Sequence, residues 1–180
     1  MSKIFFTADT HFYHANIIRY CNRPFSNVIN MNTKLIEKWN KKVKPNDTIY
    51  ILGDFAFCNG ELANTILQRL NGKKHLIRGN HDHFLTRKEF DKSHFEWVKD
   101  YHLLKTQHKG FKVKLALSHY PMYSWDSKYH GSIHLYGHVH DTEIEVDLGK
   151  SFNVGVDVND FAPVSLNKIM ERADEYDRNK

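Results

Sequence analysis

The stretch Thr48-Ile49-Tyr50-Ile51-Leu52-Gly53-Asp54 decides the fold, because an apolar run ends abruptly in a glycine and a carboxylate. A short apolar run between turn residues is typical of a buried strand. The turn signal Pro45-Asn46-Asp47 comes directly before it, and we therefore expect a strand over residues 48–52 that carries Asp54 at its end. The chain repeats this kind of junction on both sides.

Further clusters of polar residues, most of them directly after short apolar runs, are Asp9-Thr10-His11, Gly79-Asn80-His81-Asp82, Ser118-His119 and Gly137-His138-Val139-His140. Carboxylate, amide and imidazole groups bind hard or borderline divalent metals. Sites of this kind are built where several strand ends converge. The alternative is a histidine-rich protein whose histidines are satisfied separately by hydrogen bonds in the core. The recurrence of the clusters at strand ends favours one metal site.

Length and composition predict one globular domain over residues 1–180. The chain has 41% hydrophobic residues, which is enough for one sizeable core. Lys and Arg outnumber Asp and Glu by 26 to 21, and the net charge of +5 favours anionic partners such as phosphate esters or nucleic acid. Because the basic residues are scattered, a globular domain is favoured over a dedicated nucleic-acid binder.

The sequence also predicts a cytoplasmic protein without membrane attachment. Cys21 and Cys58 form no zinc or disulfide spacing, and we interpret both as free thiols in a reducing cytosol. Cys58 is left out of the metal site, because oxygen and imidazole ligands suit it better than a thiolate. No secretory segment is visible, and no apolar stretch approaches the ~20 residues that cross a bilayer. No obligate protein partner is evident.

The first half of the chain alternates strands and helices. Strands are expected over residues 3–8, 48–52 and 73–78, and helices over 15–20, 31–43 and 61–70, with Asn30 as the cap of the second helix. This alternation predicts largely parallel pairing with helices outside the sheet and right-handed crossovers.

The second half is richer in strands. Strand-like runs cover residues 97–107, 112–118, 132–137, 143–147 and 151–157, and a final helix is expected over 165–176. Because the metal-type residues come from both halves, a division into two domains would cut the site apart. Two packed sheets with helices on their outer faces fit this order best.

The ordered set Asp-x-His, Gly-Asp, Gly-Asn-His-Asp, Ser-His and Gly-His-x-His resembles the signature of the calcineurin-like metallophosphoesterase superfamily. The match runs from Asp9 to His140 and extends to the segment Asn153-Val154-Gly155-Val156-Asp157, so it covers nearly the whole chain. The resemblance implies an α/β fold, a four-layer α/β/β/α sandwich of two mixed sheets flanked by helices, with a dinuclear metal centre at the strand ends. It implies one ion held by Asp9, His11, Asp54 and His140, and a second held by Asp54, Asn80, His119 and His138.

The residue types support this assignment. Carboxylate and neutral imidazole suit Mn, Fe, Zn or Ni, and the two oxygens of Asp54 can span both ions. Two divalent ions carry about +4 and two aspartates return about −2, so the centre attracts phosphate. A metal-bridging hydroxide would then attack phosphorus. By the resemblance, Asp54 and His81 are catalytic, with His81 protonating the leaving-group oxygen or stabilising the developing charge. The neighbouring carboxylate of Asp82 could raise the pKa of His81 or fix its tautomer. His81 as a residue without a direct role stays an alternative.

Substrate contacts are less specified. His14, Arg23 and Tyr123 are candidates for binding the substrate, although His14 fits a place at a helix start equally well. Arg19, Arg23 and Arg78 suit phosphate, but for any one of them a solvated surface position is favoured. Tyr120, Tyr123 and Trp125 form an aromatic loop that suits a nucleotide, while core packing is the commoner role of such residues.

These features predict a metal-dependent phosphoesterase that hydrolyses phosphomonoesters or phosphodiesters, acting on a nucleotide or another small phosphate ester. A nuclease or RNA-end phosphatase is the alternative enzyme, and the basic balance of the chain supports it. A non-catalytic scaffold that binds metal is a further alternative. The presence of all the expected ligands and of His81 argues against it.

Overall fold

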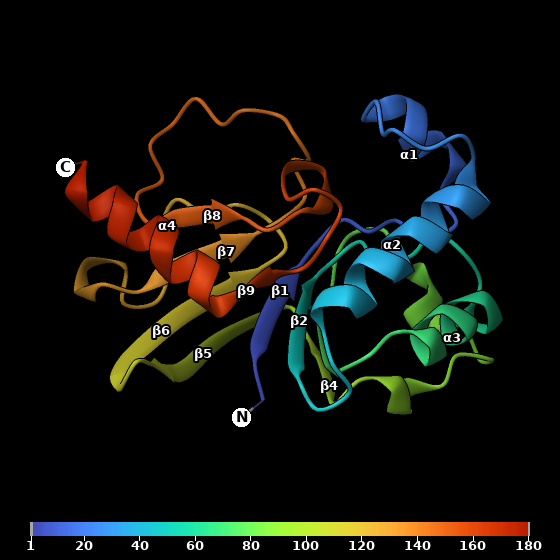
Figure 1. Ribbon diagram of the computed structural model, residues 1–180, viewed down its shortest axis with the longest axis horizontal. Helices are drawn as coiled ribbons and strands as arrows, with labels where there is room; N and C mark the ends of the chain where they lie inside the picture. Colours follow the sequence, from blue (N-terminus) through green and yellow to red (C-terminus); the bar gives the residue numbers. More distant parts are fainter. Residues whose placement is uncertain (1, 180) are drawn as a thin grey trace.

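Two mixed β-sheets form the centre of the computed structural model, which describes residues 2–179 (Figure 1). The strand order is β4-β3-β2-β1-β9 in one sheet and β5-β6-β7-β8 in the other. The expected α/β class, with two mixed sheets flanked by helices, is confirmed. Met1 and Lys180, the ends of the single domain expected over 1–180, lie outside the described residues, and the single domain stays a prediction.

The five-stranded sheet is parallel except at one edge. Its parallel strands are β1 (Ile4–Thr7), β2 (Thr48–Leu52), β3 (Lys73–Ile77) and β4 (Trp97–Lys99). The short β9 (Val164–Ser165) pairs antiparallel with β1. The helices between these strands are α1 (Ala15–Tyr20), α2 (Val28–Lys42) and α3 (Gly60–Arg69). The predicted order of strand, helix, strand, helix and strand is therefore confirmed.

The four-stranded sheet begins with a hairpin. β5 (Tyr101–His108) and β6 (Phe111–Ser118) pair antiparallel, whereas β7 (Ile133–Tyr136) and β8 (Ser151–Asn153) continue the sheet in parallel. The chain ends in α4 (Leu166–Arg178), whose first turn is capped by the Ser165 hydroxyl. Short 3-10 turns cover His83–Thr86, Lys92–His94, Lys128–His130 and Val156–Val158.

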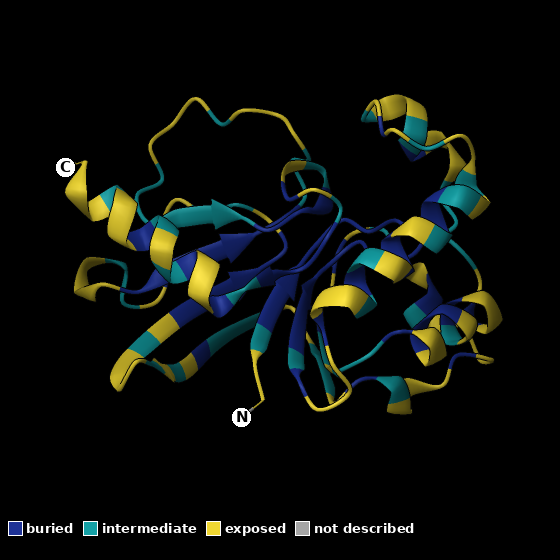
Figure 2. Ribbon diagram, viewed as in Figure 1, coloured by how far each residue is buried: buried dark blue, intermediate teal, exposed yellow. Residues whose placement is uncertain are grey.

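Two apolar cores lie on opposite faces of the five-stranded sheet, because successive side chains of a strand point to opposite faces. One core packs Phe5, Ile51 and Leu76 against α2 and α3. The other packs Phe6 and Leu52 against the four-stranded sheet and against α4, with the residues Leu115, Leu117, Leu135 and Ile169. The strands of the five-stranded sheet therefore contribute side chains to both cores, and they are the buried strands at the centre of Figure 2. On the other face of the four-stranded sheet, Trp125 from the loop after β6 packs over His134.

Two strand predictions were wrong. The run expected as one strand over 97–107 is two strands in two different sheets, because β4 pairs with β3 while β5 pairs with β6, and Asp100 lies between them. The run over 143–147 is not a strand. It belongs to the exposed loop that arches above β8 (Figures 1 and 2), where Val146 is 56% exposed. Alternation of charged and apolar residues stabilises a strand only where the apolar side chains pack on a core, and this segment has none to pack on.

Two element boundaries also differ from the prediction. Asn27, rather than Asn30, caps α2, because its extended backbone lets its side chain accept a hydrogen bond from the backbone N–H of Asn30. The strand expected over 151–157 ends at Asn153. There the Asn153 side chain accepts a hydrogen bond from the N–H of Gly155, which turns the chain out of the strand.

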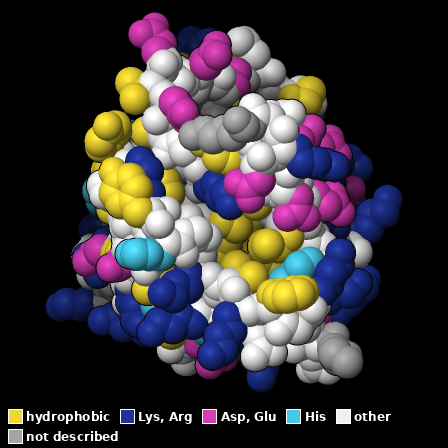
Figure 3. Space-filling view, turned by 90° about the vertical axis from the view of Figure 1, so that its left-hand side faces the viewer, with side chains coloured by type: hydrophobic (Ala, Val, Ile, Leu, Met, Phe, Trp, Pro, Cys, Tyr) yellow, Lys and Arg dark blue, Asp and Glu magenta, His cyan; other side chains and the backbone are white. Residues whose placement is uncertain are grey.

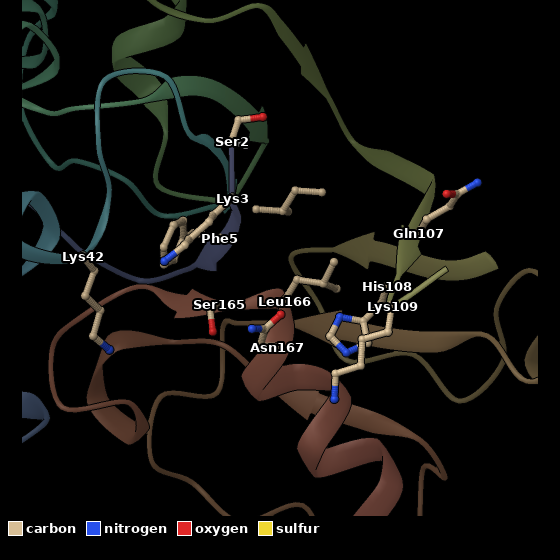
Figure 4. Close-up of a pocket in the computed structure, with 11 residues that line it drawn as sticks. Ser2, Lys3, Phe5, Lys42, Gln107, His108, Lys109, Ser165, Leu166 and Asn167 are labelled. Carbon is tan, nitrogen blue, oxygen red and sulfur yellow. The ribbon is translucent and has the colours of Figure 1, made fainter. Parts of the chain in front are cut away.

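Basic side chains are unevenly distributed over the surface. Lys and Arg gather on the lower part of the face shown in Figure 3, around an apolar hollow. A cavity of about 530 Å³ lies near the start of β1, at the opposite end of that strand from Asp9, and Lys3, Lys42, His108 and Lys109 help to line it (Figure 4). Within residues 2–179, no helix has the length and apolar character needed to pass through a membrane.

Candidate metal centre

The predicted ligands come from the carboxyl ends of strands in both sheets. The five-stranded sheet contributes residues after β1, β2 and β3, namely Asp9, His11, Asp54 and Asn80. The four-stranded sheet contributes residues after β6 and β7, namely His119, His138 and His140. Backbone hydrogen bonds from Asp9 N to Gly53 O (3.0 Å) and from His11 N to Asp54 O (3.0 Å) hold the first two loops side by side. The convergence expected from parallel strands is therefore present.

Two ligand groups result. Asp9, His11 and His140 form the first, and Asp54, His119 and His138 form the second, with the ligand atoms of each group within 4.8 Å of one another. Oδ2 of Asp54 lies 3.5 Å from Nε2 of His11 and 3.5 Å from Nε2 of His119, so its carboxylate lies between the two groups. Oδ1 of Asn80 lies 3.0 Å from Nε2 of His119. The structure thus brings together all seven predicted ligands.

The backbone is left-handed at five of these seven residues. The φ angles are 56° at Asp9, 49° at His11, 52° at Asp54, 72° at His138 and 51° at His140. A residue with a side chain in this region costs roughly 1–3 kcal/mol and persists only where its surroundings enforce it. Such strain gathers at functional sites, and here it turns the side chains after each strand toward a common centre.

Close packing around the two carboxylates requires glycine. A Cβ atom on Gly137 would lie 2.5 Å from Cβ of Ala8 and 2.5 Å from Oδ2 of Asp9. A Cβ atom on Gly79 would overlap the backbone N and the carboxylate of Asp54. The glycines of the Gly-His-x-His and Gly-Asn-His-Asp motifs therefore let the loops approach the aspartates, while the residues that follow them supply the ligands.

His119 is oriented as a ligand. Its Nδ1 lies 2.8 Å from the carbonyl oxygen of Leu52 and donates to it, which leaves the lone pair on Nε2. That nitrogen faces the oxygen atoms of Asn80 (3.0 Å) and Asp54 (3.5 Å). In the neutral ring this nitrogen offers its lone pair beside two oxygen acceptors, an arrangement that suits a bound cation. Burial opposes protonation of His119, but the hydrogen bond and charge of Asp54 raise its pKa.

Burial controls the ionisation of the other ligands. It raises the pKa of Asp9 to about 7, although His119 and His140 act against it, and it lowers the pKa of His11 to about 3. Burial also opposes ionisation of Asp54, but the hydrogen bond and charge of His119, the N–H of His81 and the charge of His11 lower its pKa to about 2. Nε2 of His11 is buried without a hydrogen-bond partner among the described residues. An unpaired imidazole nitrogen facing carboxylates fits a divalent cation.

Asp157 lies in a segment that the family resemblance includes, but the sequence predicted no role for it. Its carboxylate accepts hydrogen bonds from Nδ1 of His140 (2.7 Å) and from Nε and Nη2 of Arg23 (2.7 and 2.9 Å). The signal that was available is a carboxylate soon after a strand, as at Asp9 and Asp54. The expectation that Arg23 binds substrate is corrected, because its buried side chain also donates to the carbonyl oxygens of Asp9 (2.7 Å) and Thr10 (3.0 Å) and so lies inside the fold.

One of the two cysteines lies beside the first ligand group. The thiol of Cys21 lies near His140 and Asp157, close enough for these three side chains to form a further group. Burial and the negative charge of Asp157 raise the pKa of Cys21 to about 11, and burial raises that of Cys58 to about 12. In the metal-free protein both thiols are therefore protonated at neutral pH.

His81 lies at the mouth of the centre. Its backbone N–H donates to Oδ1 of Asp54 (2.8 Å), and its half-buried ring lies 5.6 Å from the ring of His11. The expectation that Asp82 adjusts His81 is corrected. The buried carboxylate of Asp82 accepts the backbone N–H groups of Asp54 (3.1 Å), Phe55 (2.7 Å) and Gly79 (2.8 Å), so it fixes the two loops together instead.

The remaining candidates divide clearly. Nδ1 of His14 lies 3.3 Å from Nδ1 of His11, and its ring stacks on exposed Phe57 at 4.5 Å, which puts it beside the first ligand group. Tyr123 is 71% exposed and lies against Lys128, whereas Tyr120 contacts the rings of His119 and His138.

The other members of the aromatic and arginine sets lie apart from the ligands. Trp125 is buried against His134, so its part in an aromatic platform is corrected. Arg19 and Arg78 are exposed. Arg19 lies over the ring of Tyr20, and Arg78 lies 3.5 Å from Asp100.

Comparisons with known proteins agree with this geometry. Residues 2–156 match the sequence model of the calcineurin-like phosphoesterase superfamily domain. The uncharacterized protein MJ1445 of Methanocaldococcus jannaschii is 38% identical over 178 residues, which cover 95% of this chain and 91% of that protein. The gene 66 protein of Mycobacterium phage D29 is 29% identical, with 91% and 93% covered. The solved structure of the protein of unknown function AQ665 from Aquifex aeolicus has a TM-score of 0.72 and 28% identity, covering 95% of this chain and 99% of that one.

Proposed function

The chain belongs to the calcineurin-like phosphoesterase superfamily, and from this premise we propose that it hydrolyses phosphomonoesters or phosphodiesters of a nucleotide or another small phosphate ester. Members of this superfamily are metal-dependent phosphoesterases, which supports a hydrolase in general. One observation carries the finer proposal: the Asp54 carboxylate lies 3.5 Å from a histidine of each ligand group. A shared carboxylate between two groups suits a pair of cations.

Two divalent ions, drawn from Mn, Fe, Zn or Ni, fit the carboxylate, imidazole and amide donors. Bound there, such ions would supply an activated water as nucleophile and would neutralise the phosphoryl oxygens. Asp9, His11 and His140 would hold one ion, and Asn80, His119 and His138 the other, with Asp54 shared. The mixture of two carboxylates with neutral donors leaves the centre positive, as binding of a phosphate anion requires.

His81 has the position of a general acid in this proposal. Its backbone is fixed on Asp54, while its ring is half-buried at the mouth, beside the place where a bound phosphate would present its leaving group. An imidazole has an ordinary pKa close to neutrality, so it can give a proton to a departing oxygen at physiological pH. His14 would contact the phosphate from the side of the first ligand group.

The partners and location belong to the same proposal. A small phosphate ester is the expected substrate, and the two free cysteines are consistent with a cytoplasmic protein. A nuclease or RNA-end phosphatase is the second candidate, favoured by the net charge of +5. Contacts with several phosphates would make catalysis by such an enzyme fall steeply with salt, whereas a small ester would depend on it far less.

The test is hydrolysis of p-nitrophenyl phosphate and bis(p-nitrophenyl) phosphate by protein loaded with defined Mn, Ni, Zn or Mg. We expect activity with at least one metal and its loss in Asp54→Asn, whereas Asp160→Asn, with a side chain 90% exposed, serves as the matched control. Full activity of Asp54→Asn would contradict the shared carboxylate. Absence of hydrolysis with every metal, in a protein that still binds two ions, would favour the non-catalytic scaffold.

A further inference from the structure

A cavity of about 480 Å³ adjoins the second ligand group, and none of the roles above uses it. Asn80 and His119 are among the residues that line it, so part of its wall belongs to the candidate metal centre. Its walls come from the loop after β3, from the junction of β4 and β5 and from the loop after β6, with the side chains of Arg78, Asp100, Tyr101, Tyr120 and Met122. The volume lies within the roughly 300–1,000 Å³ of small-molecule sites.

The walls of this cavity are held in place by hydrogen bonds. The carbonyl oxygen of Tyr120 accepts the hydroxyl of Ser118 (2.7 Å), and the backbone N–H of Met122 donates to Nε2 of buried His134 (3.1 Å). Tyr101 donates its hydroxyl to Asp126 (2.9 Å). A preformed wall lowers the entropy cost of binding, so the cavity is suited to a ligand rather than to closing on itself.

The chemistry of the cavity changes along its length. Near the ligand group it offers the half-exposed ring of Tyr120 and the thioether of Met122, both of which pack on flat aromatic groups. At the rim, the exposed side chains of Arg78 and Asp100 lie 3.5 Å apart and offer a donor and an acceptor together. A flat group with an apolar face and a polar edge can pack on Tyr120 and Met122 and still hydrogen-bond to Arg78 and Asp100, which an alkyl chain cannot do.

We propose that this cavity binds the base of a nucleotide whose phosphate lies at the metal centre. The inference rests on the proposed function, because the phosphate must be the group that the centre binds. Tyr120 and Met122 would pack on the faces of the base, and Arg78 and Asp100 would contact its polar edge. Tyr120 also donates its hydroxyl to Oδ1 of Asn80 (3.3 Å), so it connects the base to the second ligand group.

Methyl NMR of the methionines tests the proposal by binding alone. The chain has four methionines, and Met122 is the one that lines this cavity. In Zn²⁺-loaded His81→Gln protein, adenosine 5′-monophosphate should shift the Met122 methyl signal, which Met122→Leu identifies, and ribose 5-phosphate should shift it much less. Adenosine 5′-monophosphate should also bind about tenfold more tightly. Equal affinities, or binding that leaves the Met122 signal unchanged, would overturn the proposal.

Kinetics give an independent test. Met122→Trp fills the cavity and should lower kcat/KM for adenosine 5′-monophosphate at least about tenfold, while kcat/KM for ribose 5-phosphate stays within about twofold. The matched control is Tyr129→Trp, in the same loop at a side chain 85% exposed, and it should change neither value. Equal losses on both esters would contradict a base site. If the wild-type protein hydrolyses no phosphate ester at all, the proposed function fails, and the NMR result alone decides whether the cavity binds a base.

Discussion

Nδ1 of His140 lies 2.7 Å from Oδ2 of Asp157, and this hydrogen bond fixes the ring as a metal ligand. Because its Nδ1–H donates to the carboxylate, the ring keeps a lone pair on Nε2 for the first ligand group. Burial opposes protonation of His140, but its hydrogen bond to Asp157 raises its pKa. Arg23 in turn holds Asp157 by two contacts of 2.7 and 2.9 Å, so the orientation of the ligand depends on a residue far away in the sequence.

The Asp157→Asn substitution should weaken metal binding, in addition to the stability lost when buried Arg23 loses its counter-ion. The asparagine keeps the shape but not the charge that polarises the imidazole, and a loss of this kind typically costs about 10–100-fold in affinity. Competition between the protein and a zinc-binding dye measures the affinity. Asp160→Asn, which changes an exposed ion pair with Lys38, should leave it as in the wild type. An unchanged affinity in Asp157→Asn would remove the orienting role of this carboxylate.

The Arg23→Met substitution should destabilise the metal-free protein by about 3–5 kcal/mol, because it leaves the buried Asp157 carboxylate without its cation. It also removes the donors to the carbonyl oxygens of Asp9 and Thr10. Urea unfolding in the presence of a chelator measures the free energy. Arg78→Met, which breaks an exposed ion pair at 3.5 Å, should cost no more than about 1 kcal/mol. Equal losses would mean that the buried network contributes nothing special.

The Gly137→Ala substitution should displace Asp9 and abolish binding at the first ligand group. The added methyl carbon would lie 2.5 Å from Oδ2 of Asp9 and 2.5 Å from Cβ of Ala8, so backbone or ligand must move. Gly155→Ala meets the same oxygen at 2.9 Å and should have the weaker effect. Isothermal titration with Zn²⁺ gives the number of ions bound. Binding of two Zn²⁺ ions by Gly137→Ala would show that the loop can move to accept the methyl group without displacing the Asp9 carboxylate.

The His81→Gln substitution should slow hydrolysis most for esters with poor leaving groups. General acid catalysis typically contributes about 10²–10⁴-fold, and an alkoxide needs the proton far more than p-nitrophenolate does. The measurement compares kcat for p-nitrophenyl phosphate with that for an alkyl phosphate at constant metal content, determined by elemental analysis. Losses of the same size on both esters, or a loss of bound metal, would point to a structural effect of the substitution.

Stability should fall below pH 6.5 through His134. Burial lowers the pKa of this histidine to about 4, with Nδ1 donating to Ala116 O (3.0 Å) and Nε2 accepting the N–H of Met122 (3.1 Å). Between about pH 6.5 and pH 4 the unfolded chain binds a proton that the folded chain does not, so stability falls by on the order of 2–3 kcal/mol as the pH drops. Urea unfolding from pH 7 to 5 should show a smaller loss in His134→Gln. If the free energy of unfolding falls equally with pH in the wild type and in His134→Gln, His134 is not the cause of the loss.

The candidate site was predictable because parallel strands present their carboxyl ends at one edge. Short apolar runs before Asp9, Asp54 and Asn80 could therefore be interpreted without knowledge of side-chain packing, and the ligands after them do converge. The helical periodicity of α2 and α3 likewise predicted elements within one to three residues of their observed ends. Local pattern determines these features, and no distant contact had to be known.

The features that escaped prediction depend on distant contacts. The Asp82 carboxylate accepts hydrogen bonds from three backbone N–H groups, two of them in a loop far away in the sequence. Arg23 donates to Asp157, which is 134 residues away, and sequence spacing indicates neither role. The continuous run over 97–107 gave no sign that Asp100 separates two sheets. In each case tertiary packing selects among local conformations that the sequence alone permits equally.

Each ligand group draws side chains from both sheets, with aspartates from one and histidines after β6 and β7 from the other. A cation bound in either group is therefore a cross-link between the halves of the sandwich. Without bound metal, the protein would lose this cross-link as well as its proposed activity. The loops after β1 and β7 would then be exposed to proteolysis, which would shorten the lifetime of the protein. Cellular abundance would follow metal supply even where transcription does not.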